Sequence, residues 1–460
     1  MRWILIMVIL ASITGLILSG EKEDKEQFKR LIDEFNNAVK NNDWASACGR
    51  ARMLGELGTA DSVFVLIQAA LKYERDDLQD AIESGLCKAF DKQDGRKSIL
   101  EVTRKGNDWR ARLLAVRVLA QKRGDGVLEA LVDGLKDKAP RVVIESAYAL
   151  ASIQDLRAVR PLIDLLAATE KEKGLVWVAA RESLTAITRA DFPTADKWRS
   201  YWDAKEKEIE SAKTKGGDIK PLLGDIANPR TVLTEEIAKA PKFFGAEVLS
   251  RRIMFVIDVS SSMQAKDPEM EKTPEGELKP KGNIKIPDNA EKDEWGGIVS
   301  LPPERARIER VKRELAKCIK ELPSSVRFNI IAFSDKVKLW SPKLVKAEDS
   351  AKSTAIGWVS SLKADGDTHT DDALKAAFND PEVDTIYLLS DGQPFKAGTP
   401  VDVEPILEWV KSNNRFRKVI INTFGFENAK KTPNMDVKAM MQLLKGLADM
   451  TGGKFTDIYW

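Results

Sequence analysis

A repeat of roughly constant length constrains the first half of the chain more than any other feature of its sequence. Five segments with an apolar stripe recur at intervals of 31 to 34 residues, and their central leucines are Leu54, Leu86, Leu119, Leu150 and Leu184. Downstream of one of them, 126-GVLEALVDGL-135 matches 157-RAVRPLIDLL-166 at an offset of 31 residues. A single helix pair of this kind cannot bury its stripe alone, whereas stacked pairs form a continuous core. The first half is therefore predicted to be an all-α solenoid.

The helix pairs resemble HEAT-like repeats over residues 27–190, with an irregular helical bundle as the alternative. Trp198, Tyr201 and Trp202 follow the array at helical spacing and are expected to cap its last repeat. Residues 191–250 are assigned to this capping segment and a linker. Solenoids usually present an extended surface to other molecules. A scaffold and a mere spacer both remain open as roles for the repeats.

The second half, residues 251–460, alternates apolar β-branched runs with helical stretches. The runs cover 253–259, 327–334, 385–392, 418–426 and 454–459, and the helical stretches cover 305–322, 371–378, 401–413 and 435–450. Near-continuous apolar strands separated by helices predict an α/β domain, a doubly wound and mostly parallel sheet covered on both faces. The short run 336-KVKLW-340 is expected to be an antiparallel edge strand beside 327–334.

The composition narrows the chemistry that this chain can perform. It has three cysteines and one histidine, His369, without a CxxC or Cys/His pair, so neither a disulfide framework nor a zinc site is expected. The formal net charge of +2 shows no basic excess that would favour nucleic acid. A G-x-S-x-G elbow is absent, and the position two residues after Asp258 is Ser260 and not a second aspartate. We therefore expect no enzymatic activity.

Oxygen-bearing side chains gather where the predicted strands end. The stretch 258-DVSSS-262 follows the first strand, a threonine precedes the helix at 371–378, and an aspartate ends the run at 385–392. Ligands of such sheets bind at the carboxyl ends of the strands. Oxygen-only donors suit a hard cation such as Mg²⁺, or Mn²⁺ in its place. The predicted metal residues are Asp258, Ser260, Ser262, Thr368 and Asp391.

DVSSS, a threonine in a glycine-containing loop, and 388-LLSDG-392 together resemble the von Willebrand factor type A (VWA) family and its metal-ion-dependent adhesion site. The resemblance covers residues 251–460 and implies a Rossmann-like VWA fold. It implies direct coordination by the three hydroxyls and action of the two aspartates mainly through water. It also implies that a protein partner presents an Asp or Glu carboxylate to the open coordination position.

Several residues depart from the family pattern. Ser261 stands where glycine is frequent, and Asp367, where a second glycine is frequent, adds charge that could strengthen metal binding or weaken capture of an acidic partner. His369 could form a local hydrogen bond or tune the site with pH. An insertion at 263–304 separates the metal loop from its following helix. We expect a partly ordered flap with a small hairpin beside the metal, and a solvated loop without a role is the alternative.

Residues 1–20 differ from all that follow. Arg2 precedes the apolar run 3-WILIMVILASITGLIL-18, which is typical of a secretory signal peptide, although no good A-x-A site follows it. An uncleaved N-terminal membrane anchor is the main alternative, and a buried helix is a third. The first two place the protein in a bacterial envelope or outside it: secreted, periplasmic, or anchored facing away from the cytoplasm.

These expectations combine into one functional prediction. A metal-dependent protein–protein interaction or adhesion module, carried on a helical-repeat scaffold, fits the predicted site and the repeats together. A metal-independent structural protein of the envelope is the alternative, and a hydrolase is a more remote one.

Overall fold

The computed structural model describes most of the chain outside its N-terminal segment. The described residues are 22–73, 75–171, 173–215, 222–225, 240–268, 270–272, 278–280, 289–426 and 437–458. The predicted signal or anchor at 1–20 lies outside them. Within these ranges no helix is both long and apolar enough to cross a membrane. The chain forms two compact units, Met1–Lys136 and Asp137–Trp460.

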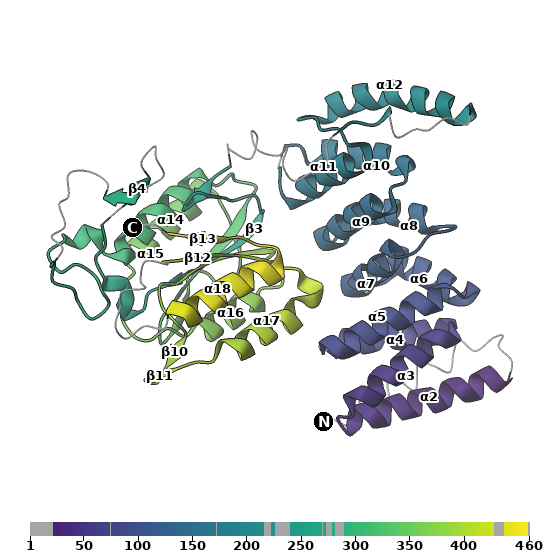
Figure 1. Cartoon of the computed structure of the whole chain (residues 1–460), viewed down its shortest axis with the longest axis horizontal. Coiled ribbons are helices and arrows are strands. Elements are labelled where there is room, and N and C mark those ends of the chain that lie inside the picture. Colours follow the sequence, from purple (N-terminus) through teal and green to yellow (C-terminus); the bar gives the residue numbers. More distant parts are fainter. Residues whose placement is uncertain are drawn as a thin grey trace. The chain divides into compact units, whose positions relative to one another are not determined.

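The described part of the first unit consists of helices stacked in chain order (Figure 1). These helices are α2 (Lys22–Lys40), α3 (Trp44–Leu57), α4 (Ala60–Lys72), α5 (Asp76–Phe90), α6 (Gln93–Lys105), α7 (Trp109–Ala120) and α8 (Val127–Gly134). Leu54, Leu86 and Leu119 lie on the alternate helices α3, α5 and α7, and all three are buried. The period found in the sequence is thus the period of helix pairs.

Glycines and inter-repeat ion pairs fix the spacing of this stack. A Cβ at Gly55 would lie only 2.2 Å from the carbonyl oxygen of Gly85, so α3 and α5 approach more closely there than a side chain would allow. On the surface, Lys88 Nζ lies 2.5 Å from Glu56 Oε1, at a separation of 32 residues. Equivalent surface positions of successive helix pairs therefore meet, as expected for a solenoid.

The second unit begins with further helices of the same kind. They are α9 (Pro140–Ile153), η2 (Leu156–Ala158), α10 (Val159–Thr169), α11 (Leu175–Thr188) and α12 (Ala195–Thr214). Leu150 and Leu184 are buried on α9 and α11. Trp198 and Trp202 of α12 are buried as well, and Trp198 meets Phe192 edge to face at 5.1 Å between ring centroids. The predicted all-α solenoid is confirmed.

A mostly parallel sheet forms the rest of the second unit (Figure 1). Its strand order is β13-β12-β9-β3-β6-β7, with β8 also paired to β6. The strands are β3 (Arg252–Asp258), β6 (Arg327–Phe333), β7 (Val337–Leu339), β8 (Val345–Lys346), β9 (Thr385–Leu389), β12 (Ile420–Gly425) and β13 (Phe455–Asp457). Strands β7 and β8 pair antiparallel to β6, and the other pairs are parallel. The predicted edge strand is confirmed.

Helices cover both faces of the sheet. Along β3, Ile253, Phe255 and Ile257 pack toward one face, and Met254 and Val256 pack toward the other. The first face carries α14 (Arg307–Glu321) and α15 (Asp349–Ser360). The second carries α16 (Thr370–Asn379), α17 (Val403–Arg417) and α18 (Val437–Thr451). The predicted α/β architecture with a buried, two-faced sheet is confirmed.

Short strands complete the unit. β1 (Lys242–Phe243) and β2 (Ala246–Glu247) form an antiparallel pair, as do β10 (Phe395–Lys396) and β11 (Thr399–Pro400). Within the insertion, β4 (Met270–Lys272) and β5 (Leu278–Pro280) form a third antiparallel pair, which agrees with the small hairpin expected there.

Candidate metal site

One residue predicted to bind metal ends the central strand of the sheet, and two more follow it closely. β3 is buried along its length, and its last residue, Asp258, is fully buried. The 3₁₀ turn η5 (Ser261–Gln264) follows, and its first backbone N donates to Gly366 O at 3.0 Å. Ser260 immediately precedes this turn and Ser262 lies in it, and both have little exposure. Two hydroxyls therefore lie at the carboxyl end of the central strand, where α/β sheets bind ligands.

The Asp258 carboxylate orders the start of this turn. Its Oδ1 accepts a hydrogen bond from the backbone N of Ser260 at 2.8 Å, and its Oδ2 accepts one from Ser390 Oγ at 2.5 Å. Burial, together with the neighbouring charge of Asp391, raises the pKa of Asp258 well above its usual range. An ionised carboxylate at this position thus gains from a nearby cation.

Asp391 joins the same network from the neighbouring strand. It follows β9 and is fully buried. Ser262 Oγ donates to Asp391 Oδ1 at 2.7 Å across 129 residues of sequence, and Ser260 Oγ lies 3.1 Å from Ser262 Oγ. Four of the five predicted residues therefore share one chain of hydrogen bonds.

Thr368 reaches the cluster from a separate loop. Its backbone N and O pair with Phe395 at 3.2 and 3.0 Å, which fixes the loop. A Cβ at Gly392, beside Asp391, would lie 3.5 Å from Thr368 Oγ1 and 3.8 Å from Ser262 Oγ. The structure thus brings all five predicted residues together at one edge of the sheet.

The two polar residues that flank Thr368 make local contacts. Asp367 Oδ2 accepts a hydrogen bond from the backbone N of Ala397 at 2.9 Å, so this carboxylate fastens the turn between β10 and β11. His369 precedes α16, and its Nδ1 lies 3.5 Å from Asp372 Oδ2. Both roles that the sequence suggested for His369 stay predictions.

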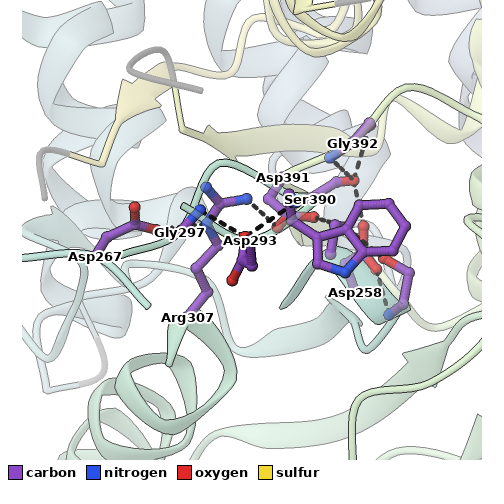
Figure 2. Close-up of polar contacts among 11 residues, drawn as sticks. Asp258, Asp267, Asp293, Gly297, Arg307, Ser390, Asp391 and Gly392 are labelled. Carbon is purple, nitrogen blue, oxygen red and sulfur yellow. Dashed lines mark hydrogen bonds and ion pairs between the residues drawn. The ribbon is translucent and has the colours of Figure 1, made fainter. Parts of the chain in front are cut away.

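The sequence reasoning missed Arg307 and Asp267. Arg307, the first residue of α14, donates from Nη1 to Asp391 Oδ2 and from Nε to Asp267 Oδ2, both at 2.7 Å (Figure 2). Its side chain is only 1% exposed. Burial by itself lowers the pKa of Arg307, but Asp391 and Asp267 reverse that effect and leave the pKa raised. The guanidinium is therefore a permanent positive charge next to the candidate site.

One signal in the sequence pointed to Arg307. The buried face of α14 continues through Val311, Leu315 and Cys318, and Arg307 occupies the first position of that stripe. A charged residue in an apolar stripe needs a partner of opposite charge, because burying it alone is costly. The partners themselves could not be read from the sequence, since Asp267 and Asp391 lie 40 and 84 residues away.

The two ends of the insertion are joined beside this arginine. The backbone N of Ile298 donates to Lys266 O at 2.7 Å, and that of Arg307 donates to Ala265 O at 3.0 Å. Gly297 allows this approach, because a Cβ there would lie 2.5 Å from the backbone N of Lys266. Asp293 Oδ1 accepts from the backbone N of Gly297 at 2.7 Å (Figure 2). These contacts hold the part of the insertion nearest the metal loop against the start of α14, and the flap itself stays a prediction.

The donors present fit a hard divalent cation. They comprise three hydroxyls and two carboxylates, all oxygen donors, which Mg²⁺ and Mn²⁺ prefer. Among the residues that the structure describes, no group of three or more His, Cys, Asp or Glu side chains could hold a metal ion. The hydroxyls of Ser260, Ser262 and Thr368 are therefore an essential part of the candidate site.

Models of known families match part of each half of the chain. The model of the von Willebrand factor type A domain matches residues 300–455, and a HEAT-repeat model matches residues 97–184. The chain carries a VWA domain preceded by HEAT repeats. The VWA match begins after the insertion, so the loop at 258–262 lies outside it.

Two human proteins that are named for a VWA domain are similar to about a third of the chain. The chain is 30% identical over 152 residues to von Willebrand factor A domain-containing protein 3B, and 29% identical over 150 residues to protein 3A. These alignments cover 33% and 32% of the chain but only 11% and 12% of the relatives.

Two solved structures are similar to slightly less than half of the chain. A von Willebrand factor type A structure from Catenulispora acidiphila is 16% identical with a TM-score of 0.31, covering 46% of this chain and 40% of its own. The PilB minor pilin from Streptococcus sanguinis is also 16% identical with a TM-score of 0.31, covering 47% and 59%.

Proposed function

We propose that the VWA domain is a metal-dependent protein-binding module that captures a carboxylate of its partner. A VWA domain suggests protein–protein interaction in general, and the metal dependence is our specific addition. The observation that carries it is the convergence of Ser260, Ser262 and Thr368 with two buried aspartates at one sheet edge. Nucleic acid is not an expected partner, because the net charge is only +2.

The hydroxyl and carboxylate side chains would have different roles in binding the cation. The three hydroxyls would coordinate Mg²⁺ or Mn²⁺ directly, while Asp258 and Asp391 orient them and balance the charge, mainly through water. The hydrogen bond from Ser262 to Asp391 holds the hydroxyl oxygen in place for this role. When bound, the cation supplies an open coordination position for a carboxylate oxygen.

The experiment is a pull-down from extract of the source cells with the full chain as bait. Three conditions are compared: wild type with Mg²⁺, wild type with chelator, and Thr368→Ala with Mg²⁺. Thr368→Ser, which keeps the hydroxyl, and Thr354→Ala, which changes an exposed threonine of α15, are the matched controls. A partner that wild type and both control variants retain only when Mg²⁺ is present supports the proposal.

The alternative is a structural protein whose contacts need no metal. It predicts the same partners in all three conditions, which would assign binding to the repeats or to the insertion. A hydrolase is the more remote alternative, because the sequence has a single histidine, His369, and no G-x-S-x-G elbow.

We further infer that the protein acts outside the cytoplasm, as a secreted, periplasmic or membrane-anchored protein. The apolar run 3–18 after Arg2 supports this inference. Protease treatment of intact cells and of opened cells tests it, because an outward-facing protein is digested once the outer permeability barrier is removed. Protection until the cytoplasmic membrane is broken would contradict it.

A further inference from the structure

The guanidinium of Arg307 bridges the metal-site candidate and the insertion. One nitrogen donates to Asp391 and another to Asp267, each at 2.7 Å, and the side chain is 1% exposed (Figure 2). Asp267 lies near the start of the insertion and is 12% exposed, while Arg307 lies three residues after its end. The backbone also joins these two segments, because the backbone N of Asp267 donates to Arg305 O at 3.1 Å.

This bridge changes the charge that a bound cation would meet. Asp258 and Asp391 bring two formal negative charges to the site, Asp267 adds a third, and Arg307 contributes one positive charge. The net formal charge of these residues is therefore −2, which a divalent cation reduces to zero. Without Arg307 the net charge with the cation would be −1, and without Asp267 it would be +1. At a buried site such differences act with little screening by solvent.

We propose that Arg307, held by Asp267, is an internal counter-cation that sets the charge balance of the metal site: it lowers the site's affinity for the divalent cation and raises the affinity of the loaded site for a carboxylate. This inference rests on the proposed function of the site. Arg307 is a positioning residue, because it acts through Asp391. Asp391 uses Oδ2 for Arg307 and Oδ1 for Ser262, so the arginine fixes the carboxylate without occupying the oxygen that orients the hydroxyl.

The same contact supports the site when no cation is bound. Asp391 is fully buried, and a buried carboxylate without a counter-ion is costly. Arg307 supplies that counter-ion within the protein, so the site can lose its cation without losing its structure. Reversible binding of metal, and hence of a partner, follows from this arrangement.

Two single substitutions with opposite expected effects test the proposal in the full chain. Arg307→Met removes the positive charge, so its affinity for Mn²⁺ should rise by about tenfold, while Asp267→Asn leaves the positive charge unbalanced, so its affinity should fall by about tenfold. Mn²⁺ affinity is measured by isothermal titration calorimetry at constant ionic strength. Arg313→Met, at an exposed position of the same helix, is the control and should leave the affinity unchanged.

The second measurement concerns the carboxylate. Sodium acetate is added in place of an equal concentration of sodium chloride, and the change in apparent Mn²⁺ affinity is recorded. Acetate should strengthen Mn²⁺ binding in the wild type, more strongly in Asp267→Asn, and not at all in Arg307→Met. This coupling follows from linkage, because a ligand of the loaded site must favour loading.

Thermal unfolding in the presence of chelator shows whether the variants are folded. Arg307→Met should melt at a lower temperature than wild type in chelator, and Mn²⁺ should restore more stability to it than to wild type. Asp267→Asn and Arg307→Lys, which keep the positive charge, carry the test if Arg307→Met does not fold. Arg307→Lys should retain the wild-type response to acetate.

The outcomes separate this inference from the proposed function. If wild type binds no Mn²⁺, the proposed function fails and the inference fails with it. If wild type binds Mn²⁺ but both substitutions weaken binding alike, Arg307 and Asp267 have only a structural role and the inference alone is overturned. An unchanged response to acetate in Arg307→Met would overturn it as well.

Discussion

Phe243 is expected to be a main support of the VWA core although it precedes the first strand of the sheet. It belongs to β1 and is fully buried. Its ring centroid lies 5.0 Å from that of Phe424, 5.5 Å from that of Phe255 and 6.4 Å from that of Tyr387, so it touches three strands of the sheet. The Tyr387 hydroxyl also donates to Glu247 O of β2 at 3.1 Å, which fastens the pair of short strands. We predict that Phe243→Ala destabilises this unit strongly.

The expected size follows from burial. Removing a fully buried phenylalanine side chain costs about 3–5 kcal/mol, because the transfer energy is lost and a cavity remains. For a domain of this size each kcal/mol lowers the melting temperature by about 2–4 °C, so a decrease on the order of 10 °C is expected. The aromatic neighbours pack from several directions, which limits collapse of the cavity.

Calorimetry of the full chain measures this effect directly. The unfolding transition of the VWA domain should move while that of the first unit stays in place. Phe64→Ala is the matched control, because Phe64 lies on α4 and is 52% exposed. A decrease below about 2 °C for Phe243→Ala would refute the reasoning and show that β1 packs only loosely on the sheet.

Three further predictions concern the site, the repeats and the thiols. Ser262→Ala should lower the free energy of unfolding by about 1–3 kcal/mol in urea without metal, because buried Asp391 loses a donor, and an effect no larger than that of Thr368→Ala would contradict this. Arg181→Met should lower the free energy of unfolding by about 3–5 kcal/mol, because it leaves the buried Asp191 carboxylate without its ion-pair partner. The double variant Arg181→Met/Asp191→Leu should recover most of this loss, and no recovery would argue against the ion pair. Ellman's reagent at pH 8 should label the thiols of Cys48, Cys87 and Cys318 slowly in the native protein and fully in the denatured one. Burial raises the pKa of all three thiols, that of Cys87 to about 11. Rapid labelling of the native protein would contradict this prediction.

Much of the fold could be predicted because its strands and repeats are marked by local apolar patterns. The run at 253–259 has a buried residue at nearly every position, and it became β3. The helix α15 was not predicted, because half of the residues in 349-DSAKSTAIGWVS-360 are polar and the helix buries only Ala355 and Val359. Phe243 was assigned to a linker for a similar reason, since two short strands in a mixed stretch carry no clear period.

The five candidate metal residues could be predicted because each lies at the end of a recognisable strand or the start of a recognisable helix. Sheet topology then brings together residues that are 129 positions apart, such as Ser262 and Asp391. The bridge formed by Arg307 could not be predicted, because its two partners come from a loop of irregular structure and from a distant strand. Such pairs depend on tertiary packing, which local patterns do not encode.

Titration of Mn²⁺ into the metal-free full chain tests the central claim most directly. The account predicts saturable binding of one ion per chain in wild type and loss of that binding in Thr368→Ala, with circular dichroism spectra that coincide. A folded wild-type protein that releases or takes up no heat with either Mn²⁺ or Mg²⁺, across a range of temperatures, would contradict it.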